Sequence, residues 1–228
     1  MERSYTCDEI YRIMEQEIID LRIKPGAMLS EHSLCQRFSA SRTPIRSVLQ
    51  RLQENGLVQI MPYKGTMVTL LDFDIINQII YQRVAVETMV LRDFAKTCNP
   101  LELEQVRYAL NNLTGIYTAG NIDIHRFYAA DSRMHEIWFR SQRKMYLWEC
   151  FQKAQSNYSR FRMLDIVEAN NFGDVIAEHA EMLRIIEHKD CGAIEPLMQQ
   201  HLFGGIRRLG HLIFTDFKDY FVSTENPA

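Results

Sequence analysis

The sequence predicts a mainly α-helical protein in which a small N-terminal domain with one β-hairpin precedes a larger, all-helical domain. Only two neighbouring segments, 57–61 and 66–70, show the apolar–polar alternation that is typical of strands. Before and after them, apolar residues recur at helical spacing. The pattern changes at 71–74, so we expect one domain at 1–72 and a second at 73–228.

Length and composition are those of an ordinary globular protein. A chain of 228 residues can form one large or two modest domains, and its apolar fraction of 46% and charged fraction of 24% are those of an ordinary soluble globular protein. No apolar run reaches the length of a membrane span, and the N-terminus is polar and acidic rather than signal-like. Five cysteines are scattered without a Cys-x-x-Cys pair, as in reduced thiols of the cytosol. We therefore expect a cytoplasmic protein.

The first two helices are expected to support a third one. Apolar residues at helical spacing predict a helix over about 5–21, and Lys24-Pro25-Gly26 then predicts a turn. Ser30 is a suitable N-cap for a short helix that ends near Phe38. We expect both helices to hold the third at a fixed tilt. Their inward residues are Ile10, Ile13, Met14, Ile18, Leu34 and Phe38.

The segment 39–68 predicts this third helix, followed by the hairpin. Ser41 or Thr43 can cap the helix, and Pro44 falls in its first turn, where a missing N–H costs nothing. Gly56 stands where a glycine often follows a helix C-cap. One buried stripe is expected to contain Ile45, Val48, Leu49 and Leu52.

Polar and basic residues on this helix and at the tip of the hairpin indicate a DNA reader. They lie off the buried stripe, and several stand at the helix N-terminus, where exposed N–H groups suit phosphates and base edges. The net charge of the chain is −3, but the segment 42–64 has four basic residues against one acidic residue. Phosphate contact depends on this local charge. The candidate DNA-binding residues are Ser41, Arg42, Thr43, Arg46, Gln50, Lys64 and Gly65.

The run PGAMLSEHSLCQRFSASRTPIRSVLQRLQENGLVQIMPYKGTMV resembles the winged helix-turn-helix of the GntR family of bacterial regulators. The agreement keeps its order over about forty residues, far more than a short motif. The resemblance implies that the partner is double-stranded DNA and that the role is in transcription. The matching positions are Pro25-Gly26, Leu29-Ser30-Glu31, Ser41-Arg42-Thr43-Pro44, Arg46, Leu49, Leu52, Gly56-Leu57-Val58 and Gly65.

The second domain is expected to be a bundle of six or seven helices. The expected helices cover 74–98, 99–118, 121–140, 144–164, 172–188, 191–209 and 211–221. In the fourth of them, the buried side is expected to contain Leu147, Phe151, Ala154, Tyr158 and Phe161.

Four residues of this bundle could bind a metal ion. Asp131 and His135 are four apart on one helix and therefore share a face. His179 and His201 lie in line with inward apolar residues of two later helices. One carboxylate and three imidazoles suit a divalent ion, Zn²⁺ first, with Ni²⁺ or Mn²⁺ as alternatives. A single inward histidine is more often an ordinary core residue, so spacing alone leaves that alternative open.

The same four residues resemble the ligand set of the FCD domain, the helical effector domain of the FadR-like branch of the GntR family. Together with the DNA reader, the resemblance covers nearly the whole chain. It implies a mainly α fold, in which a winged helix-turn-helix is followed by an FCD-type bundle. It also implies that a bound metal helps to hold a small carboxylate effector.

Arg83 and Asn157 are the candidate effector-binding residues. A guanidinium group can hold a carboxylate through two hydrogen bonds, and Arg83 lies on the long first helix of the bundle. The alternative is that Arg83 forms an i,i+4 pair with Glu87 at the protein surface. Asn157 and Tyr158 could line the pocket, although core packing explains Tyr158 better.

We therefore expect a ligand-responsive transcriptional regulator, most simply a repressor, that senses a small organic or sugar acid. It would act as a homodimer on a pseudo-palindromic operator and would need no membrane. A metal-dependent enzyme is the alternative, because three histidines and an aspartate could activate water. Glu136 and Glu178 adjoin the ligands in sequence and should point away from them, so we expect no enzyme. A protein-interaction module would not need Arg42 and Arg46.

Overall fold

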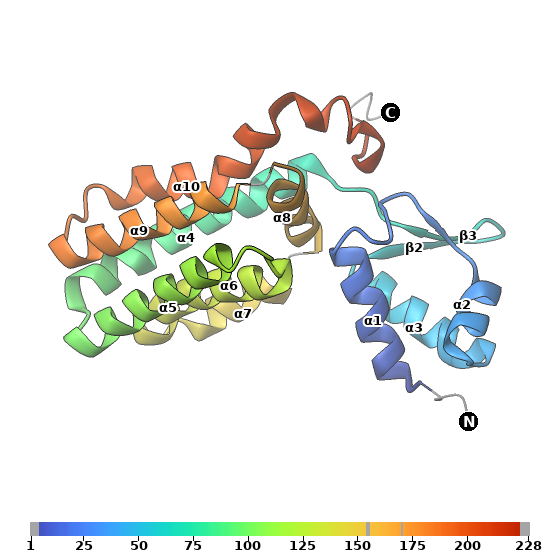
Figure 1. Cartoon of the computed structure of the whole chain (residues 1–228). Helices are drawn as coiled ribbons and strands as arrows, with labels where there is room; N and C mark the ends of the chain where they lie inside the picture. The colour runs from blue at the N-terminus through green and yellow to red at the C-terminus, as the bar shows by residue number, and fades with distance from the viewer. Residues whose placement is uncertain (1–4, 154–155, 170, 224–228) are drawn as a thin grey trace. The chain divides into compact units, whose positions relative to one another are not determined.

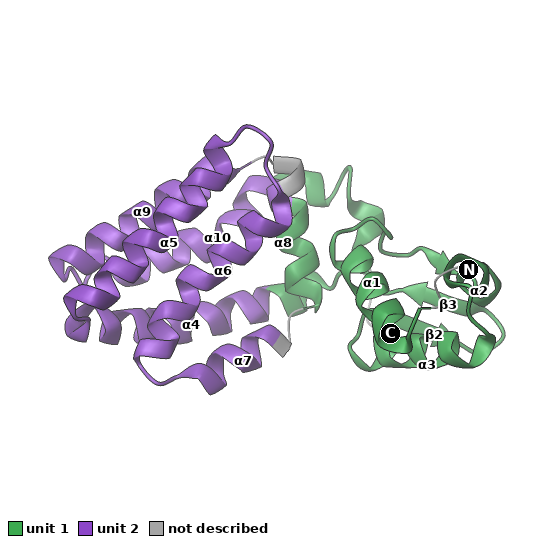
Figure 2. Ribbon diagram, turned by 60° about the horizontal axis from the view of Figure 1, so that its bottom comes forward, with its two compact units in different colours: residues 1–76, 156–164, 210–228 green, residues 77–155, 165–209 purple. Residues whose placement is uncertain are grey.

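The chain is mostly helical, with one small sheet in its N-terminal part (Figure 1). The computed structural model describes residues 5–153, 156–169 and 171–223. The chain forms two compact units, shown in Figure 2: the first comprises residues 1–76, 156–164 and 210–228, and the second residues 77–155 and 165–209. Two helices, α4 (Phe73–Thr97) and α8 (Ser156–Ala169), therefore belong partly to each unit.

The first unit begins with two capped helices. Helix α1 (Cys7–Ile19) starts after Thr6, whose hydroxyl accepts from the Glu9 N–H while the Glu9 carboxylate accepts from the Thr6 N–H. Helix α2 (Glu31–Phe38) starts after Ser30, as predicted, and the Ser30 hydroxyl accepts from the Ser33 N–H. These bonds satisfy N–H groups that have no partner inside a helix.

Helix α3 (Arg42–Glu54) is the third helix of this unit, and both α1 and α2 pack against it. Gly56 follows its C-cap with a φ of 69°, in the left-handed region that favours glycine, so the prediction of its role was correct. Because the buried stripe of α3 is used by the core, its polar face is left outward. The core of the unit includes Ile10, Met14, Ile18, Phe38, Ile45, Val48, Leu49 and Leu52.

A three-stranded antiparallel sheet, ordered β1-β3-β2, completes the winged domain. Strands β2 (Val58–Met61) and β3 (Gly65–Val68) form the expected hairpin, with Met61 opposite Gly65 at its tip. The sequence did not predict β1 (Met28–Leu29), because two residues are too few to show an alternation. The turn of the hairpin has a positive φ at Tyr63 (62°) and at Gly65 (106°).

The remaining helices build the second unit, in which α5 packs against α6 and α9, and α9 packs against α10. They bring segments that are distant in sequence to one interior, where the histidines lie. Their bounds are α5 (Pro100–Thr118), α6 (Ile124–Ser141), α7 (Met145–Lys153), α9 (Phe172–His188) and α10 (Ile194–Leu209).

The helix expected at 144–164 is instead two helices, α7 and α8, and Ala154 lies outside the described residues. As a separate helix, α7 turns Trp148 and Phe151 towards Phe139, with ring centroids 5.2 and 5.8 Å apart. Leu147 therefore lies off the buried face and is 36% exposed, so its expected burial was wrong.

The helix expected at 211–221 was also wrong. This segment forms two 3₁₀ turns, Gly210–Ile213 and Lys218–Tyr220. Its end pairs with the segment after the wing: the Leu71 N–H donates to the Tyr220 carbonyl at 2.8 Å, and the Val222 N–H donates to the Leu71 carbonyl at 2.9 Å. These long-range bonds satisfy backbone groups outside any helix.

Within the described parts of the chain, helices with enough length and apolar character to cross a membrane are absent.

Candidate metal centre and DNA-binding surface

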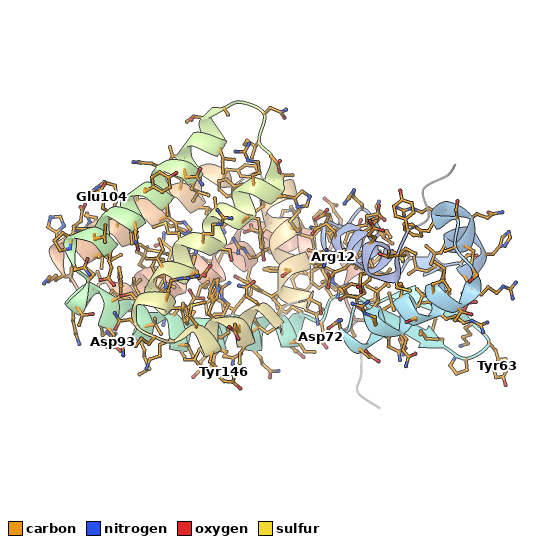
Figure 3. The ribbon with its side chains drawn as sticks, turned by 90° about the horizontal axis from the view of Figure 1, so that it is seen from below. Arg12, Tyr63, Asp72, Asp93, Glu104 and Tyr146 are labelled. Carbon is orange, nitrogen blue, oxygen red and sulfur yellow. The ribbon has the colours of Figure 1, made fainter. Side chains whose placement is uncertain are left out.

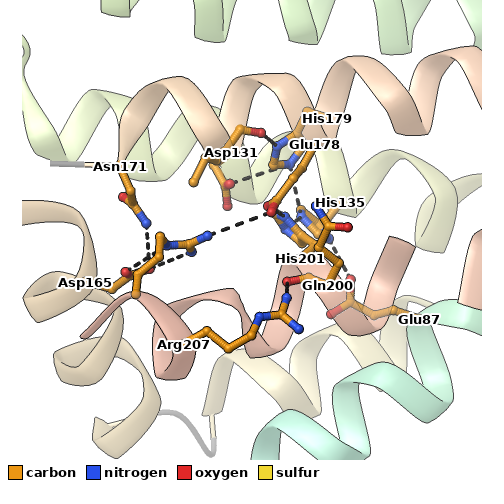
Figure 4. Close-up of polar contacts among 12 residues, drawn as sticks. Glu87, Asp131, His135, Asp165, Asn171, Glu178, His179, Gln200, His201 and Arg207 are labelled. Carbon is orange, nitrogen blue, oxygen red and sulfur yellow. Dashed lines mark hydrogen bonds and ion pairs between the residues drawn. The ribbon is translucent and has the colours of Figure 1, made fainter. Parts of the chain in front are cut away.

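The four predicted metal ligands come together in the second unit. Asp131 and His135 come from α6, His179 from α9 and His201 from α10 (Figure 4). One ligand atom from each lies within 4.8 Å of the others. The His135 Nε2 atom is 3.2 Å from His179 Nε2 and 3.3 Å from His201 Nε2, and His179 Nε2 is 3.5 Å from Asp131 Oδ1. We refer to these four residues as the histidine cluster.

The opposite nitrogen of each ring is held by an oxygen acceptor. His135 Nδ1 lies 2.6 Å from Glu87 Oε2, and His201 Nδ1 lies 2.8 Å from Glu178 Oε2. His179 Nδ1 lies 2.7 Å from the Val175 carbonyl oxygen. Because carboxylate and carbonyl oxygens only accept, each Nδ1 carries the proton and each Nε2 directs its lone pair into the cluster. This is the arrangement that orients histidines towards a metal ion.

Electrostatics also fit a cation at this place. Burial lowers the pKa of both His135 and His201 below the ordinary value, which favours the neutral imidazole that ligates metals. Three lone pairs and the Asp131 carboxylate would repel one another without a positive charge between them. The His₃Asp donor set suits a divalent ion such as Zn²⁺. The histidine cluster could therefore hold a metal ion.

Glu178 is the residue whose position differs most from the expectation. We expected Glu178 to point away from the ligands, because it adjoins His179 on the same helix. It does diverge from His179, but it reaches His201 on the facing helix α10. Burial raises its pKa, but His201 and Arg208 overcome that effect and hold the pKa below the ordinary range. The spacing of residues within α9 could not predict this contact, because its partner His201 lies on another helix. Glu136 instead pairs with Arg140.

Arg83 lies next to the histidine cluster but not at the surface. Its Nε donates to Glu87 Oε1 at 2.6 Å, so the i,i+4 pair exists, yet Arg83 is 3% and Glu87 0% exposed. Burial raises the pKa of Glu87, but the charges of Arg83 and His135 outweigh it and lower that pKa to about 2. Glu87 therefore links Arg83 to a histidine of the cluster, a role that the sequence analysis missed.

Asn157, the other candidate effector-binding residue, belongs to the first unit, where its Oδ1 accepts from the Asp72 N–H at 3.3 Å and from Arg160 at 3.2 Å. Its role in effector binding stays a prediction. Tyr158 is 3% exposed, as core packing requires.

A solvent-open pocket of about 860 Å³ lies on α9 and α10. It is lined in part by Glu178 and Arg208, and Glu178 is in turn the partner of His201. Gln200 and Arg207 also line it. A small polar molecule could therefore lie within reach of the group that orients one cluster histidine.

The predicted DNA-binding residues of α3 are all exposed. These are Ser41, Arg42, Thr43, Arg46 and Gln50. Ser41 is the N-cap of α3, but its side chain makes no capping bond, and Pro44 at the third helical position has no N–H to donate to it. The first N–H groups of α3 therefore point outward without a helical acceptor, which suits a phosphate.

Two further features shape this surface. Lys64 and Gly65 are exposed at the wing, beside Tyr63, which projects fully into solvent (Figure 3). Arg46 Nε lies 3.0 Å from Glu31 Oε1, and the Arg46 side chain is 65% exposed. Such an exposed pair is weak, so Glu31 would not prevent Arg46 from turning to a phosphate.

We predict that Gly65→Val weakens DNA binding. A β-branched residue is strained at a φ of 106°, and a Cβ at this position would lie 3.2 Å from Met28 Cε on the neighbouring strand. The wing turn should therefore change shape, and operator affinity, measured by fluorescence anisotropy, should fall several-fold while metal binding is retained. Gly192→Val, at a glycine of the second unit without a positive φ, is the control. Unchanged affinity for Gly65→Val would show that DNA binding does not need this turn.

The fold and the exposed helix α3 define a DNA-binding regulator, and comparison with known proteins agrees. Residues 6–68 match the family of bacterial regulatory proteins of the gntR family, and residues 78–204 match the FCD domain. The chain belongs to the GntR family and has an FCD domain as its second part, which confirms the predicted family and fold class.

Curated relatives and solved structures are similar over most of their length. The HTH-type transcriptional repressor RspR of Escherichia coli K12 is 26% identical, with 85% of this chain and 84% of that protein covered. The galactonate operon transcriptional repressor of the same strain is 26% identical, with 89% and 96% covered. A structure described as a putative GntR regulator from Rhodococcus sp. RHA1 shares the fold, with a TM-score of 0.69, 22% identity, and 90% and 97% covered. These relatives are transcriptional regulators and not enzymes, as expected for this chain.

Proposed function

We propose that this chain is a transcriptional repressor whose affinity for its operator is controlled by a small acid bound at a metal ion in the histidine cluster. The observation that carries the proposal is the convergence of three Nε2 atoms and one carboxylate, each ring being oriented by an acceptor at Nδ1. This site lies in the same chain as a family DNA-binding domain.

The metal ion would be held by Asp131, His135, His179 and His201, most simply as Zn²⁺, with Ni²⁺ or Mn²⁺ as alternatives. A metal ion bound there would have an open coordination position that a carboxylate could fill. The chain's own groups would do the rest: Glu87 and Glu178 keep the rings in the ligating tautomer, and the surrounding core excludes water.

The effector would be a small organic or sugar acid. Arg83 supplies a buried guanidinium beside the cluster, and the pocket on α9 and α10 supplies polar side chains. One relative is named for a galactonate operon, and galactonate is a sugar acid with one carboxylate. We keep Arg83 and Asn157 as the proposed effector-binding residues.

DNA would be bound by a homodimer, through α3 and the wing of each copy. Two recognition helices related by a two-fold axis fit a pseudo-palindromic operator. The proposed contacts are Ser41, Arg42, Thr43, Arg46, Gln50, Lys64 and Gly65.

Selection from a pool of random duplex DNA tests this function. The full chain should enrich a pseudo-palindromic sequence, and its affinity should fall steeply with salt because phosphate contacts release counterions. The selected operator complex is then titrated with galactonate and other sugar acids, with and without Zn²⁺. We expect an acid that changes operator affinity only in the metal-loaded protein. Failure to enrich any sequence would contradict sequence-specific DNA binding. A change in operator affinity that an acid causes equally with and without Zn²⁺ would contradict the role of the histidine cluster.

We predict that Glu178→Gln weakens metal binding. The Glu178 carboxylate beside His201 Nδ1 fixes the orientation of the ring and raises its basicity as a ligand. Because the variant lacks this charge, Zn²⁺ affinity should fall roughly 10- to 100-fold. A competition titration with a chromophoric chelator measures it. Glu181→Gln changes an exposed carboxylate one turn along α9 and should leave the affinity unchanged. Equal affinities for both variants would contradict the orienting role of Glu178.

A further inference from the structure

Helix α8 is part of both compact units. Its residues 156–164 group with the winged domain, and its residues from 165 onward group with the helical unit (Figure 2). Among the side chains of α8 whose burial is described, each of these two parts carries one charged group that is almost fully buried: Arg160 is 0% exposed and Asp165 is 5% exposed. The partners of these two side chains suggest what the helix does.

In the second unit, Asp165 is connected to the histidine cluster through polar contacts. Its carboxylate accepts from Arg208 Nη2 at 2.8 Å and from Arg208 Nε at 3.1 Å. Arg208 Nη1 lies 3.8 Å from Glu178 Oε1. Glu178 Oε2 in turn accepts from His201 Nδ1 at 2.8 Å (Figure 4). A proposed metal ligand on α10 is therefore joined to α8 by two intermediate side chains.

Gly204 makes room for this connection. A Cβ atom at Gly204 would lie 2.5 Å from Arg208 Nη1 and 2.9 Å from its Cζ. Any side chain at this position would displace the guanidinium group, the part of Arg208 that contacts Asp165. Glycine at position 204 therefore leaves the guanidinium group the space it occupies, in the interior of a helix where glycine otherwise destabilises.

In the first unit, Arg160 holds the base of the wing. Arg160 Nη1 donates to the Thr69 carbonyl at 2.6 Å, and Nη2 donates to Thr69 Oγ1 at 3.1 Å. Thr69 directly follows β3, its N–H donates to the Leu57 carbonyl, and its hydroxyl donates to the Gly56 carbonyl at 2.8 Å. Arg160 therefore hydrogen-bonds to Thr69, the residue that connects the end of α3 with the end of the wing.

Arg160 makes these contacts at an electrostatic cost. The four acceptors that the structure gives it, including the Ser156 carbonyl and Asn157 Oδ1, are all neutral. Burial lowers its pKa to about 10, which still leaves it charged at neutral pH. A buried cation held by neutral oxygens contributes little net stability, so a role in positioning explains it better than a role in stability.

We propose that α8 transmits the state of the histidine cluster to the base of the wing, with Asp165 and Arg160 as the positioning residues at its two ends. This rests on the proposed function of the cluster. Asp165 is five positions after Arg160, on the order of 7.5 Å along a rigid helix, so a displacement of Asp165 is passed on to Arg160. Binding that draws in His201 moves Glu178 and Arg208, and through α8 it changes the support of Thr69. Coupling of this kind requires that binding at the cluster favours one position of α8.

Hydrogen–deuterium exchange of the full chain tests the proposal, with Zn²⁺ alone as the probe. Two amides report on the base of the wing: Thr69 N–H, bonded to the Leu57 carbonyl, and Leu71 N–H, bonded to the Tyr220 carbonyl. In the wild type, Zn²⁺ should slow exchange at both several-fold. In Gly204→Ala and in Arg160→Met, Zn²⁺ should still bind, but exchange at these amides should no longer respond.

A second arm needs no metal. In the metal-free protein, Asp165→Asn should speed exchange at Thr69 and Leu71 several-fold, because Arg208 no longer holds α8. Gly204→Ala, which displaces Arg208 without removing a charge, should do the same if Asp165→Asn does not fold. Glu181→Gln, an exposed carboxylate on α9, is the matched control and should have no effect.

The outcomes separate the two ideas. If the wild type binds Zn²⁺ but amide exchange slows only in the second unit and not at Thr69 and Leu71, the role of α8 is overturned while the metal site stands. If the wild type takes up no Zn²⁺, the proposed metal site fails and the metal-free arm decides. Unchanged exchange at Thr69 and Leu71 in both Asp165→Asn and Gly204→Ala, without metal, overturns the proposal.

Discussion

His179→Ala is expected to weaken metal binding strongly and to remove most of the stabilisation that a metal provides. His179 is 0% exposed and contributes the Nε2 atom that lies 3.2 Å from His135 Nε2. Its loss leaves three ligands on two helices instead of four ligands on three, so Zn²⁺ affinity should fall by at least about 100-fold. At Zn²⁺ 100-fold above its Kd, binding to the folded state adds about 2.7 kcal/mol. For a chain of this size, that corresponds to roughly 5–10 °C in Tm.

The measurement must separate the metal from the cavity that the substitution leaves. Removal of a buried imidazole also destabilises the metal-free protein, so the informative quantity is the difference in Tm with and without Zn²⁺ for each variant. The wild type should show the full difference and His179→Ala almost none. His188→Ala, at an exposed histidine in the last turn of the same helix, should behave as the wild type. An unchanged metal content in His179→Ala, measured by elemental analysis of untagged protein, would refute the four-ligand site.

Arg42→Ala and Arg46→Ala should each weaken operator binding strongly without changing the fold. Both side chains are exposed at the N-terminal end of α3, outside its buried stripe. A bidentate contact with a base is worth about 1–3 kcal/mol, which is roughly a 5- to 150-fold loss of affinity and a relaxed sequence preference. If the contact is with a phosphate, affinity falls for all sequences and the salt slope decreases by about 1.

The control for these variants lies on the same helix. Arg51→Ala removes the same charge from the last turn of α3, where Arg51 pairs with Asp8 at 2.7 Å and packs on the Tyr11 ring. Its effect on operator affinity should be small. A loss equal to that of Arg42→Ala would indicate a general charge effect, and wild-type affinity in both Arg42→Ala and Arg46→Ala would defeat the assignment.

Local features of the sequence were sufficient for most of the secondary structure. The N-cap Ser30, Gly56 after α3 and the apolar stripe of α3 all occur where the pattern predicts. Such features depend on neighbours within about four residues, so a linear sequence contains them. The same spacing placed Asp131 and His135 on one face of α6, and the family resemblance pointed to His179 and His201.

Contacts between helices that are distant in sequence were decided only by the tertiary structure. The sequence did not indicate that Glu178 meets His201 or that Asp165 meets Arg208, because helical periodicity tells which face is buried but not what lies opposite it. The same limit explains Leu147, since the face that α7 buries depends on the position of Phe139. The sequence alone thus determined a helical DNA-binding regulator with inward histidines. Packing decided which carboxylates orient those histidines and which helix leads from them to the wing, because these contacts form only when separate helices are brought together.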